Sequence, residues 1–460
     1  LVLAFTRPTL FERRTDWRST EGVHQRIDLA PLGTGHAREL AHELLKALPR
    51  APSALSELLT RSAEGNPFYM EELLKMLIER GAIDTRVESG EPWKLNAERL
   101  LATQVPPTLN GVLQARLDGL PPSEKHALQQ ASVVGAVFWD QALAAVDTLA
   151  AGQLPALVRR ALTLPRPDGT LEGLREYGFE HQLLHQVTYG TVLKRARREG
   201  HAKVARWLTE LMPQGGLRGG KQLGLAAEHF ERAGDLANAA EYHARAAEQA
   251  ARLYAHERVL QHVDQALALL GGPSLEQAEL RWRLLGAREL TLGQQARRDE
   301  QGADLSALQR LAHELDDDRR RAEVARRVSM RAMRMANRPE QERAAHECMA
   351  WAQQAGDERL RLSGLRLLAA ALVRRNEVQA GRRLALQGLA EARSLGLREV
   401  EAQMLNVLTI AAGMQGDMLE GLELVQQALE FYRETANRDN VAVSLLNLGL
   451  GWMNLGDLIQ

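Results

Sequence analysis

Gly215, Gly220 and Lys221 have the spacing of a phosphate-binding loop, G-x-x-x-x-G-K. In that pattern, backbone N–H groups and the lysine surround the phosphates of a nucleotide, and a Ser or Thr after the lysine reaches Mg²⁺. Here Gln222 stands at that position, and the residues before the loop form a helical pattern where a strand is required. We therefore interpret the segment as a linker. No hydrophobic run in the sequence ends in an acidic pair that could hold Mg²⁺, so we expect no ATP hydrolysis by this chain alone.

His181 and His185 are spaced as i and i+4 and would share one face of a helix, as pairs of zinc ligands do. A metalloprotease needs Glu directly after the first His, and here Gln182 follows it. With no third ligand evident, the sequence predicts no metal site. No Ser/His/Asp or Cys/His grouping stands out, so we assign no catalytic residue. The single cysteine, Cys348, lies within a helical pattern and is interpreted as a core residue.

The stretch EGNPFYMEELL, residues 64–74, combines a turn with the start of an amphipathic helix. Asn66 is suited to cap this helix, and Pro67 to its first position, where no N–H donor is needed. Glu71 and Glu72 follow near the positive end of the helix dipole. These features are enough to explain a helix start, and a binding role for the turn depends on its surroundings.

Two basic stretches, residues 194–206 and 319–334, could contact phosphates. Acidic residues lie close to both, and aromatic residues are not interleaved as stacking on single strands requires. We interpret them as solvated helix faces, and DNA is not expected as a partner.

The composition is typical of a folded, mainly helical protein. Hydrophobic residues make up 45% of the chain and aromatic ones only 4%, while 58 basic residues balance 59 acidic ones. Balanced charge gives no overall attraction to nucleic acid or to an anionic membrane. No apolar run approaches the ~20 residues of a membrane span, and no signal peptide is visible. A lone cysteine fits a reducing compartment, so we predict a cytoplasmic location.

The first half of the chain mixes short strand patterns with helices. Apolar runs at residues 1–5 and 26–29 are typical of buried strands. Helical periodicity predicts helices from Thr34 onward and at about 53–63, 67–80, 96–103, 108–118, 122–133, 151–162 and 181–212. A new unit begins at Val105. Within it, Asp168 and Gly169 form the turn of a predicted β-hairpin, and helices with one such hairpin favour a winged helix.

Beyond the Gly-rich linker the sequence repeats at a constant interval. Leu365, Leu405 and Leu445 fall in phase, and Asn376 and Gly416 mark equivalent turns between paired helices. A column of leucines at this period indicates an α-solenoid of helical hairpins. We expect the array to be truncated at the last residue.

In this order the segments resemble the STAND class of signal-transduction ATPases, in the branch found in large bacterial regulators. LVLAFTRP resembles the sensor-1 strand of the AAA-like core, RIDLAPL its last strand, and RSAEGNPFYMEELL the Gly-x-Pro motif of the helical lid. VPPTLNGVLQARLDGLPPSEK resembles the entry to a winged helix, and YGFEHQLLHQVTY its closing strand and helix. The resemblance covers nearly the whole chain. The Walker A and Walker B segments of the family would lie before Leu1, so we expect a fragment whose N-terminal part is missing.

The resemblance implies a nucleotide site shared among several segments. Arg7 would sense the γ-phosphate, Asn66 and Pro67 would contact the base, and His181 would reach a phosphate in the ADP-bound closed state. A guanidinium can neutralise charge on a phosphoryl group, and a helix N-terminus is electropositive. A structural His packed under the wing explains His181 equally well. ATP or ADP with Mg²⁺ is expected as the cofactor of the full-length parent, and no cofactor for this chain alone.

The predicted fold is mainly α: the remnant of an α/β ATPase core, a helical lid, a winged helix and an α-solenoid of tetratricopeptide-like repeats. The predicted domain bounds are 1–32 for the end of the core, 33–104 for the lid, 105–212 for the winged helix, 213–222 for a linker and 223–460 for the repeats.

We predict the regulatory and sensory C-terminal portion of such an ATPase. Exchange of ADP for ATP would release the winged helix from the core, and the repeats would bind a protein or small effector. Nucleotide-dependent self-association is a further expectation. The parent would carry a Ser/Thr kinase or an adenylate or guanylate cyclase, between which the sequence does not choose.

Two alternatives stay open: a transcription regulator whose winged helix reads DNA, and a repeat scaffold that works without nucleotide. The helix before the hairpin offers only Gln153, Arg159 and Arg160 to base edges, so we rank DNA binding lower.

Overall fold

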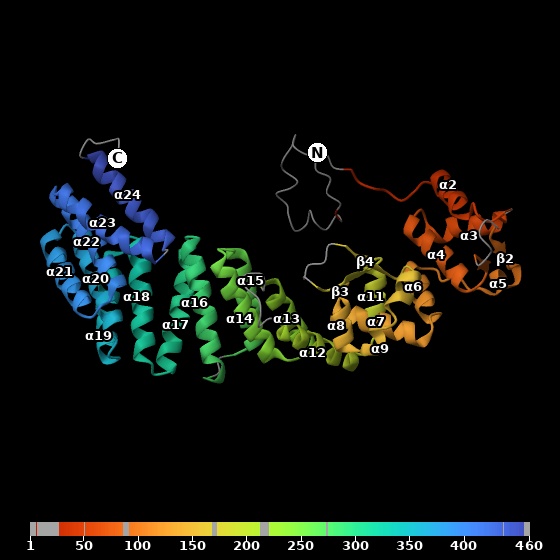
Figure 1. Ribbon diagram of the computed structural model, residues 1–460, viewed down its shortest axis with the longest axis horizontal. Coiled ribbons are helices and arrows are strands. Elements are labelled where there is room, and N and C mark those ends of the chain that lie inside the picture. Colours follow the sequence, from red (N-terminus) through yellow and green to blue (C-terminus); the bar gives the residue numbers. More distant parts are fainter. Residues whose placement is uncertain are drawn as a thin grey trace. The chain divides into compact units, whose positions relative to one another are not determined.

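The computed structural model describes residues 6, 27–49, 51–85, 92–167, 173–211, 220–272, 275–435 and 437–454 (Figure 1). It divides into two compact units, Leu1–Gly200 and His201–Gln460. The predicted strand at residues 1–5, Arg7 and the predicted turn at Asp168 and Gly169 lie outside the described residues.

The first unit begins with three helices packed around one apolar core. They are α2 (Thr34–Leu45), α3 (Ser53–Ala63) and α4 (Pro67–Glu79), and all three match the sequence prediction. A ribbon of two short antiparallel strands, β1 (Ile83–Asp84) and β2 (Lys94–Leu95), and helix α5 (Ala97–Ala102) complete this part. The sequence did not reveal the ribbon, because such short strands cannot show an alternating pattern.

The predicted strand at residues 26–29 is wrong over its described part. Ile27, Asp28 and Leu29 have no regular structure, and the side chains of Ile27 and Leu29 are exposed. No described strand pairs with this segment, and an unpaired strand leaves its N–H and C=O groups without partners.

The second part of the first unit combines short helices with a three-stranded antiparallel sheet. The helices are α6 (Leu109–Asp118), α7 (Pro122–Val134), α8 (Asp140–Val146), α9 (Thr148–Ala151), α10 (Leu154–Arg159) and α11 (Gln182–Thr191). The sheet has the order β3 (Val137–Trp139), β5 (Glu176–Phe179), β4 (Thr163–Arg166). The predicted hairpin is confirmed, since Leu164 of β4 lies opposite Gly178 of β5. Strand β3 is an addition that the sequence did not reveal.

Two helices that the sequence predicted as continuous are interrupted. The segment 151–162 breaks at Gly152, and Pro155 lies at the start of the next helix, α10. The segment 181–212 breaks at Val192, which has an extended backbone between α11 and α12 (Lys194–Glu210). Helix α12 crosses the division between the two units at Gly200.

The second unit is helical throughout its described part. Its first helices are α13 (Gly220–Ala233), α14 (Leu236–Arg252) and α15 (His256–Leu270), followed by a short 3-10 helix, η4 (Leu275–Gln277). The following even-numbered helices are α16 (Ala278–Gln294), α18 (Asp318–Arg334), α20 (Glu358–Arg374), α22 (Arg398–Gln415) and α24 (Arg438–Asn454). The odd-numbered ones are α17 (Arg298–Glu314), α19 (Arg338–Gln354), α21 (Val378–Ser394) and α23 (Met418–Glu434).

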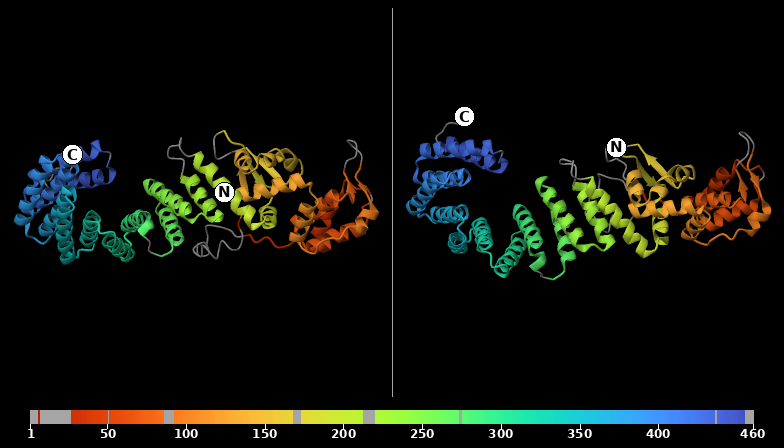
Figure 2. Two further views of the ribbon diagram at one scale, coloured as in Figure 1. Left: turned by 90° about the horizontal axis from the view of Figure 1, so that it is seen from below. Right: turned by 60° about the horizontal axis from the view of Figure 1, so that its bottom comes forward.

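Within each series the helix starts recur at the interval of the leucine columns, which confirms the α-solenoid of helical hairpins (Figure 2). Among the described residues, no helix is long and apolar enough to cross a membrane. The predicted columns are buried inside the array: Leu365 and Leu405 are 4% and 3% exposed, and Cys348 is fully buried as a core residue. Leu445 departs from its column and is 46% exposed, because α24 has no further described helix packed against it.

The even-numbered helices form the inner side of the curve in this unit. Helix α18 contacts α20 and α20 contacts α22, in addition to the contacts within each hairpin. Figure 1 shows α19 and α21 on the outer side. Side chains from successive even-numbered helices therefore meet on one face.

A left-handed residue follows each successive helix of the array at a regular interval. The series is Ala296, Asp316, Ala336, Gly356, Asn376, Gly396 and Gly416, with φ between 49° and 83°. After each such residue the chain starts the next helix, as at Asp357, whose N–H donates back to Ala352 O and whose carboxylate accepts from Leu360 N. Only every second turn of this series is recognisable from the sequence, as at Asn376 and Gly416.

These left-handed turns predict that replacing alanine by glycine and replacing glycine by alanine have opposite effects on the free energy of unfolding. Ala336 bears the steric cost of a left-handed Cβ, so Ala336→Gly should raise the free energy of unfolding by about 1 kcal/mol. An added Cβ at Gly356 meets no atom within 4 Å, so Gly356→Ala should lower it by a similar amount through backbone conformation alone. Urea denaturation measures both. Ala303→Gly, on an exposed position within α17, is the control and should destabilise. A loss of stability in Ala336→Gly would contradict the assignment.

Candidate functional site

The turn before α4 depends on Gly65, which packs closely against the chain segment that precedes α2. Glu64 and Gly65 both have positive φ, and a Cβ on Gly65 would lie 2.4 Å from Leu32 O. Leu32 N donates to Gly65 O at 2.8 Å. Asn66 Oδ1 accepts from Tyr69 N at 3.3 Å and Pro67 takes the first helical position, as the sequence predicted. The Asn66 and Pro67 side chains are exposed, so this end of α4 is accessible.

The sequence suggests that Glu72 interacts with the positive end of its own helix dipole, but in the structure it has a different partner. Its side chain is 1% exposed and forms an ion pair with Arg116 of α6, which is 3% exposed. Arg116 also donates from Nε and Nη2 to the two carboxylate oxygens of Glu79, at 3.1 and 2.8 Å. Burial alone would lower the pKa of Arg116, but Glu79 and Glu72 raise it overall. The guanidinium is thus a fixed positive charge between two carboxylates of α4.

Lys75 extends this network to the sheet of the second part. Its Nζ lies 2.9 Å from Glu72 Oε1 and 3.3 Å from Glu180 Oε1. Glu180 is the residue that directly follows strand β5. Burial acts to lower the pKa of Lys75, but the hydrogen bond and charge of Glu72, together with Glu180, raise it overall. Charged side chains from α4, α6 and the end of β5 therefore hold the two parts of the first unit together. Tyr69 adds a hydrogen bond from its hydroxyl to Pro106 O at 2.8 Å.

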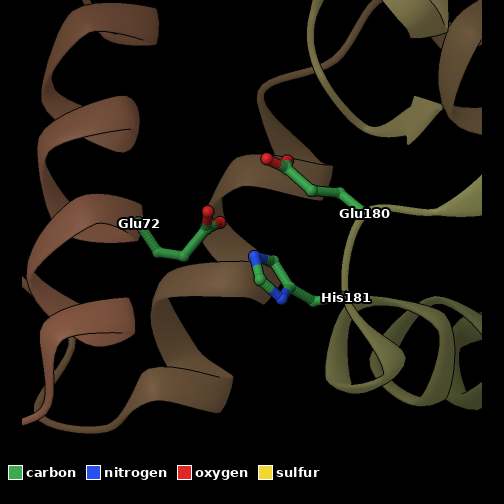
Figure 3. Close-up of side chains that lie close together, drawn as sticks. All are labelled: Glu72, Glu180 and His181. Atoms are coloured by element: carbon green, nitrogen blue, oxygen red, sulfur yellow. The ribbon is translucent and has the colours of Figure 1, made fainter.

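His181 lies at this junction, directly before α11. Its ring centroid is 3.9 Å from that of Phe68, which directly follows Pro67. Figure 3 shows the imidazole close to the carboxylates of Glu72 and Glu180, and one ligand atom from each of the three lies within 4.8 Å of the others. Lys75 Nζ already pairs with these two carboxylates, which gives the cluster a structural explanation without a metal ion.

The i, i+4 histidine pair considered from sequence does not come together at one site. His185 Nε2 lies 2.9 Å from Ser132 O, and its ring contacts Phe179 edge to face at 5.1 Å. His181 instead joins Glu72, which belongs to a much earlier helix of the chain. No local pattern could have revealed that grouping.

Of the four residues expected at a nucleotide site, the structure describes three. Asn66 and Pro67 lie at the start of α4, and His181 contacts Phe68, the residue after Pro67. Arg7 lies outside the described residues. In the stretch 215–221, which has the spacing of a phosphate-binding loop, Gly220 and Lys221 begin helix α13, and residues 212–219 lie outside the described part.

The basic stretch 319–334 is largely engaged in ion pairs. Arg319 pairs with Asp357 at 2.9 Å, Arg321 with Asp318 at 2.6 Å, and Glu323 with Arg326. The first of these pairs joins neighbouring hairpins, and the other two lie within a single helix.

Comparisons with known proteins give only distant structural likenesses. No family model matches the chain, and the curated proteins include no match. A signal-transduction ATPase with numerous domains (STAND) and a tetratricopeptide-repeat sensor, from Pyrococcus horikoshii, aligns at 11% identity over 93% of this chain and 64% of its own, with a TM-score of 0.36. The chain thus spans less than two thirds of that protein. The apo form of RapI aligns at 10% identity over 61% of this chain and 84% of its own, with a TM-score of 0.42. Aspartyl phosphate phosphatase F from Bacillus subtilis aligns at 10% identity over 75% of this chain and 88% of its own, with a TM-score of 0.40. Similarities this weak do not assign the chain to a family.

The buried network predicts a large effect of removing its central cation. Arg116→Met leaves the Glu72 carboxylate buried with Lys75 as its remaining cation, and should lower the free energy of unfolding of the first unit by about 3–5 kcal/mol. The double variant Glu72→Leu/Arg116→Met should recover most of that loss, because it removes both buried charges.

Chemical denaturation measures these effects. Lys46→Met, which breaks an exposed 3.0 Å pair with Glu43, is the control and should cost less than about 1 kcal/mol. An Arg116→Met effect as small as that of the control would show that the network does not stabilise the junction.

Proposed function

We propose that this chain is the regulatory and sensory part of a STAND-type signal-transduction ATPase, and that its helical repeats bind a protein or peptide effector. The observation that carries the proposal is a groove of about 560 Å³ on the inner side of the solenoid. Side chains from α16, α18, α20 and α22 line it. A surface built from successive hairpins suits an extended partner.

The walls of this groove are charged and carry both signs. Arg319 pairs with Asp357 and Arg359 pairs with Glu399, each pair joining two successive hairpins. The Arg319 and Arg359 side chains are 76% and 62% exposed. Exposed ion pairs contribute about 0–1 kcal/mol, so a ligand can exchange its own charges for these at little cost. The Arg320 guanidinium lies over the Trp282 ring, 5.1 Å from its centre, and both residues line the groove.

The start of α4 supports the nucleotide-linked half of the proposal. Asn66 and Pro67 are exposed and so accessible to a base, and His181 contacts Phe68, the residue next to Pro67. Together with Arg7, these residues would contact ATP or ADP with Mg²⁺ in a longer protein. The three-stranded sheet with α6–α11 supports a winged helix, which exchange of ADP for ATP would release from the ATPase core. Self-association would follow that release.

A peptide selection tests the effector half. Twelve-residue peptides selected by display against the immobilised chain should bind in the groove, so Arg359→Glu should weaken them at least tenfold in fluorescence anisotropy. Arg343→Glu is the matched control on α19, where Arg343 forms a comparable exposed pair with Glu347 at 2.6 Å. That variant should change affinity less than twofold. Failure to select any peptide, or equal effects of both variants, would overturn the proposal.

Nucleotide affinity tests the other half, in a longer protein that joins this chain to a phosphate-binding loop. His181→Ala should weaken ADP binding about tenfold and ATP binding less, because a contact made only in the ADP state favours that state alone. Isothermal titration calorimetry measures both affinities, with the exposed His36→Ala as control. Unchanged ADP affinity in His181→Ala would remove His181 from the site.

A further inference from the structure

We propose that a second cavity on the inner face binds an acidic side chain of the effector peptide, with Arg366 as the residue that receives its carboxylate; this rests on the peptide-binding function proposed above. The cavity has a volume of about 260 Å³ and lies between α18, α20 and α22, and Tyr432 and Asn440 also line it. Gln403 lines both this cavity and the charged groove, so the two are neighbours along one binding surface.

The cavity contains two arginines and no acid among its described lining residues. Arg366 and Arg374 have no ion pair within the part of the chain that the structure describes, although most arginines of the neighbouring hairpins do. Burial, with repulsion from Arg326 and Arg374, lowers the pKa of Arg366 to about 10, so it still carries its charge at neutral pH. The Arg366 residue is partly buried and its Nε is fully buried. Taking a guanidinium out of water without a counter-charge is costly, and an anionic ligand removes that cost.

Two polar atoms in this cavity lack any partner. Arg366 Nε is buried and donates to nothing, and Asn406 Oδ1 is buried and accepts from nothing, within the described residues. Asn406 is held in place because its Nδ2 donates to Tyr432 Oη at 3.1 Å. The cavity therefore presents one unused donor with positive charge and one unused acceptor.

The preceding hairpin shows what is missing. Arg326 of α18 occupies the position equivalent to Arg366 of α20, and it forms two hydrogen bonds to Glu323, at 2.7 and 2.8 Å. The residue equivalent to Glu323 in the next hairpin is Ser363. The arginine is present in both hairpins while its internal acid is present in only one, so at Arg366 the carboxylate has to come from outside.

A peptide satisfies both unused groups, whereas a simple anion satisfies one. The carboxylate of a Glu or Asp side chain accepts from Arg366, and a backbone N–H of the same segment donates to Asn406 Oδ1. Inorganic phosphate or a free carboxylate offers mainly acceptors. The continuity with the charged groove through Gln403 also fits an extended chain that occupies both.

A paired peptide array tests this inference. Each nine-residue peptide, acetylated and amidated so that no terminal carboxylate is present, is made with a central Glu or a central Gln. Sequences that bind the unchanged chain should prefer Glu at least tenfold, as expected for a charge-assisted hydrogen bond. Arg366→Met should lose most of the preference for Glu, with Arg374 as the remaining cation of the cavity, whereas the outer-face control Arg343→Met should keep that preference in full.

A third variant supplies the missing acid within the chain. Ser363→Glu would reproduce the Glu323–Arg326 arrangement at Arg366, and should abolish the preference for Glu. Both Ser363→Glu and Arg366→Met should raise the thermal unfolding midpoint by about 2–4 °C, because each removes the uncompensated buried charge.

The outcomes separate the two proposals. Peptides that bind without any preference for Glu would overturn the Arg366 inference and leave the peptide-binding function intact. An array without any binding peptide would overturn both. A lower unfolding midpoint for Arg366→Met would show that Arg366 has a structural partner, and would also overturn the inference.

Discussion

The second unit depends on a backbone constraint: from α16 to α22, each helix is followed by a left-handed residue at a fixed interval from the last. The turns at Ala336, Gly356 and Asn376 all have positive φ, although only one of them is a glycine. The interval between the left-handed turns is therefore kept even where the residue has a Cβ and its backbone is strained by a positive φ. Because helix length and turn geometry repeat, α18 lies against α20 and α20 against α22 with the same face inward. The charged groove and the Arg366 cavity both follow from that regularity.

Regular geometry also makes the repeat positions comparable, which gives single residues a meaning that they would otherwise lack. An unpaired arginine in an irregular protein could be explained by many local features. In the solenoid, Arg326 and Arg366 occupy equivalent places on α18 and α20, and they differ in whether an acid stands at the i−3 position. The scaffold is thus held constant while the charge balance changes. The fold does not require the acid to be absent at one position. Such a difference is therefore expected where a repeat array has acquired a ligand contact.

The sequence predicted the parts of the structure that rest on periodicity or on local backbone rules. The in-phase columns of leucine predicted the solenoid, and Asn66 and Pro67 predicted the start of α4. The sequence did not predict what depends on contacts between distant residues. The sequence suggests that Glu72 interacts with its own helix dipole, but in the structure it forms a buried ion pair with Arg116 of a later helix. The spacing of His181 and His185 suggests a pair, but in the structure the His181 ring contacts Phe68. Strand β3 is very short and its pairing partner is β5, so its own pattern carries too little information.

A ligand on the inner face would act on the solenoid through nearest neighbours. Each hairpin contacts mainly the hairpins before and after it, so the stability of the array is a sum of repeat and interface contributions. A peptide that contacts α18, α20 and α22 together adds favourable free energy to the states in which these helices keep their mutual spacing. Arg366 increases this dependence, because its charge lies in the cavity between these helices without a counter-charge until an anion is bound. Binding energy and the release of that electrostatic penalty then act in the same direction. An effector that lacks the carboxylate can occupy the groove, but it leaves the penalty in place and so shifts the solenoid less.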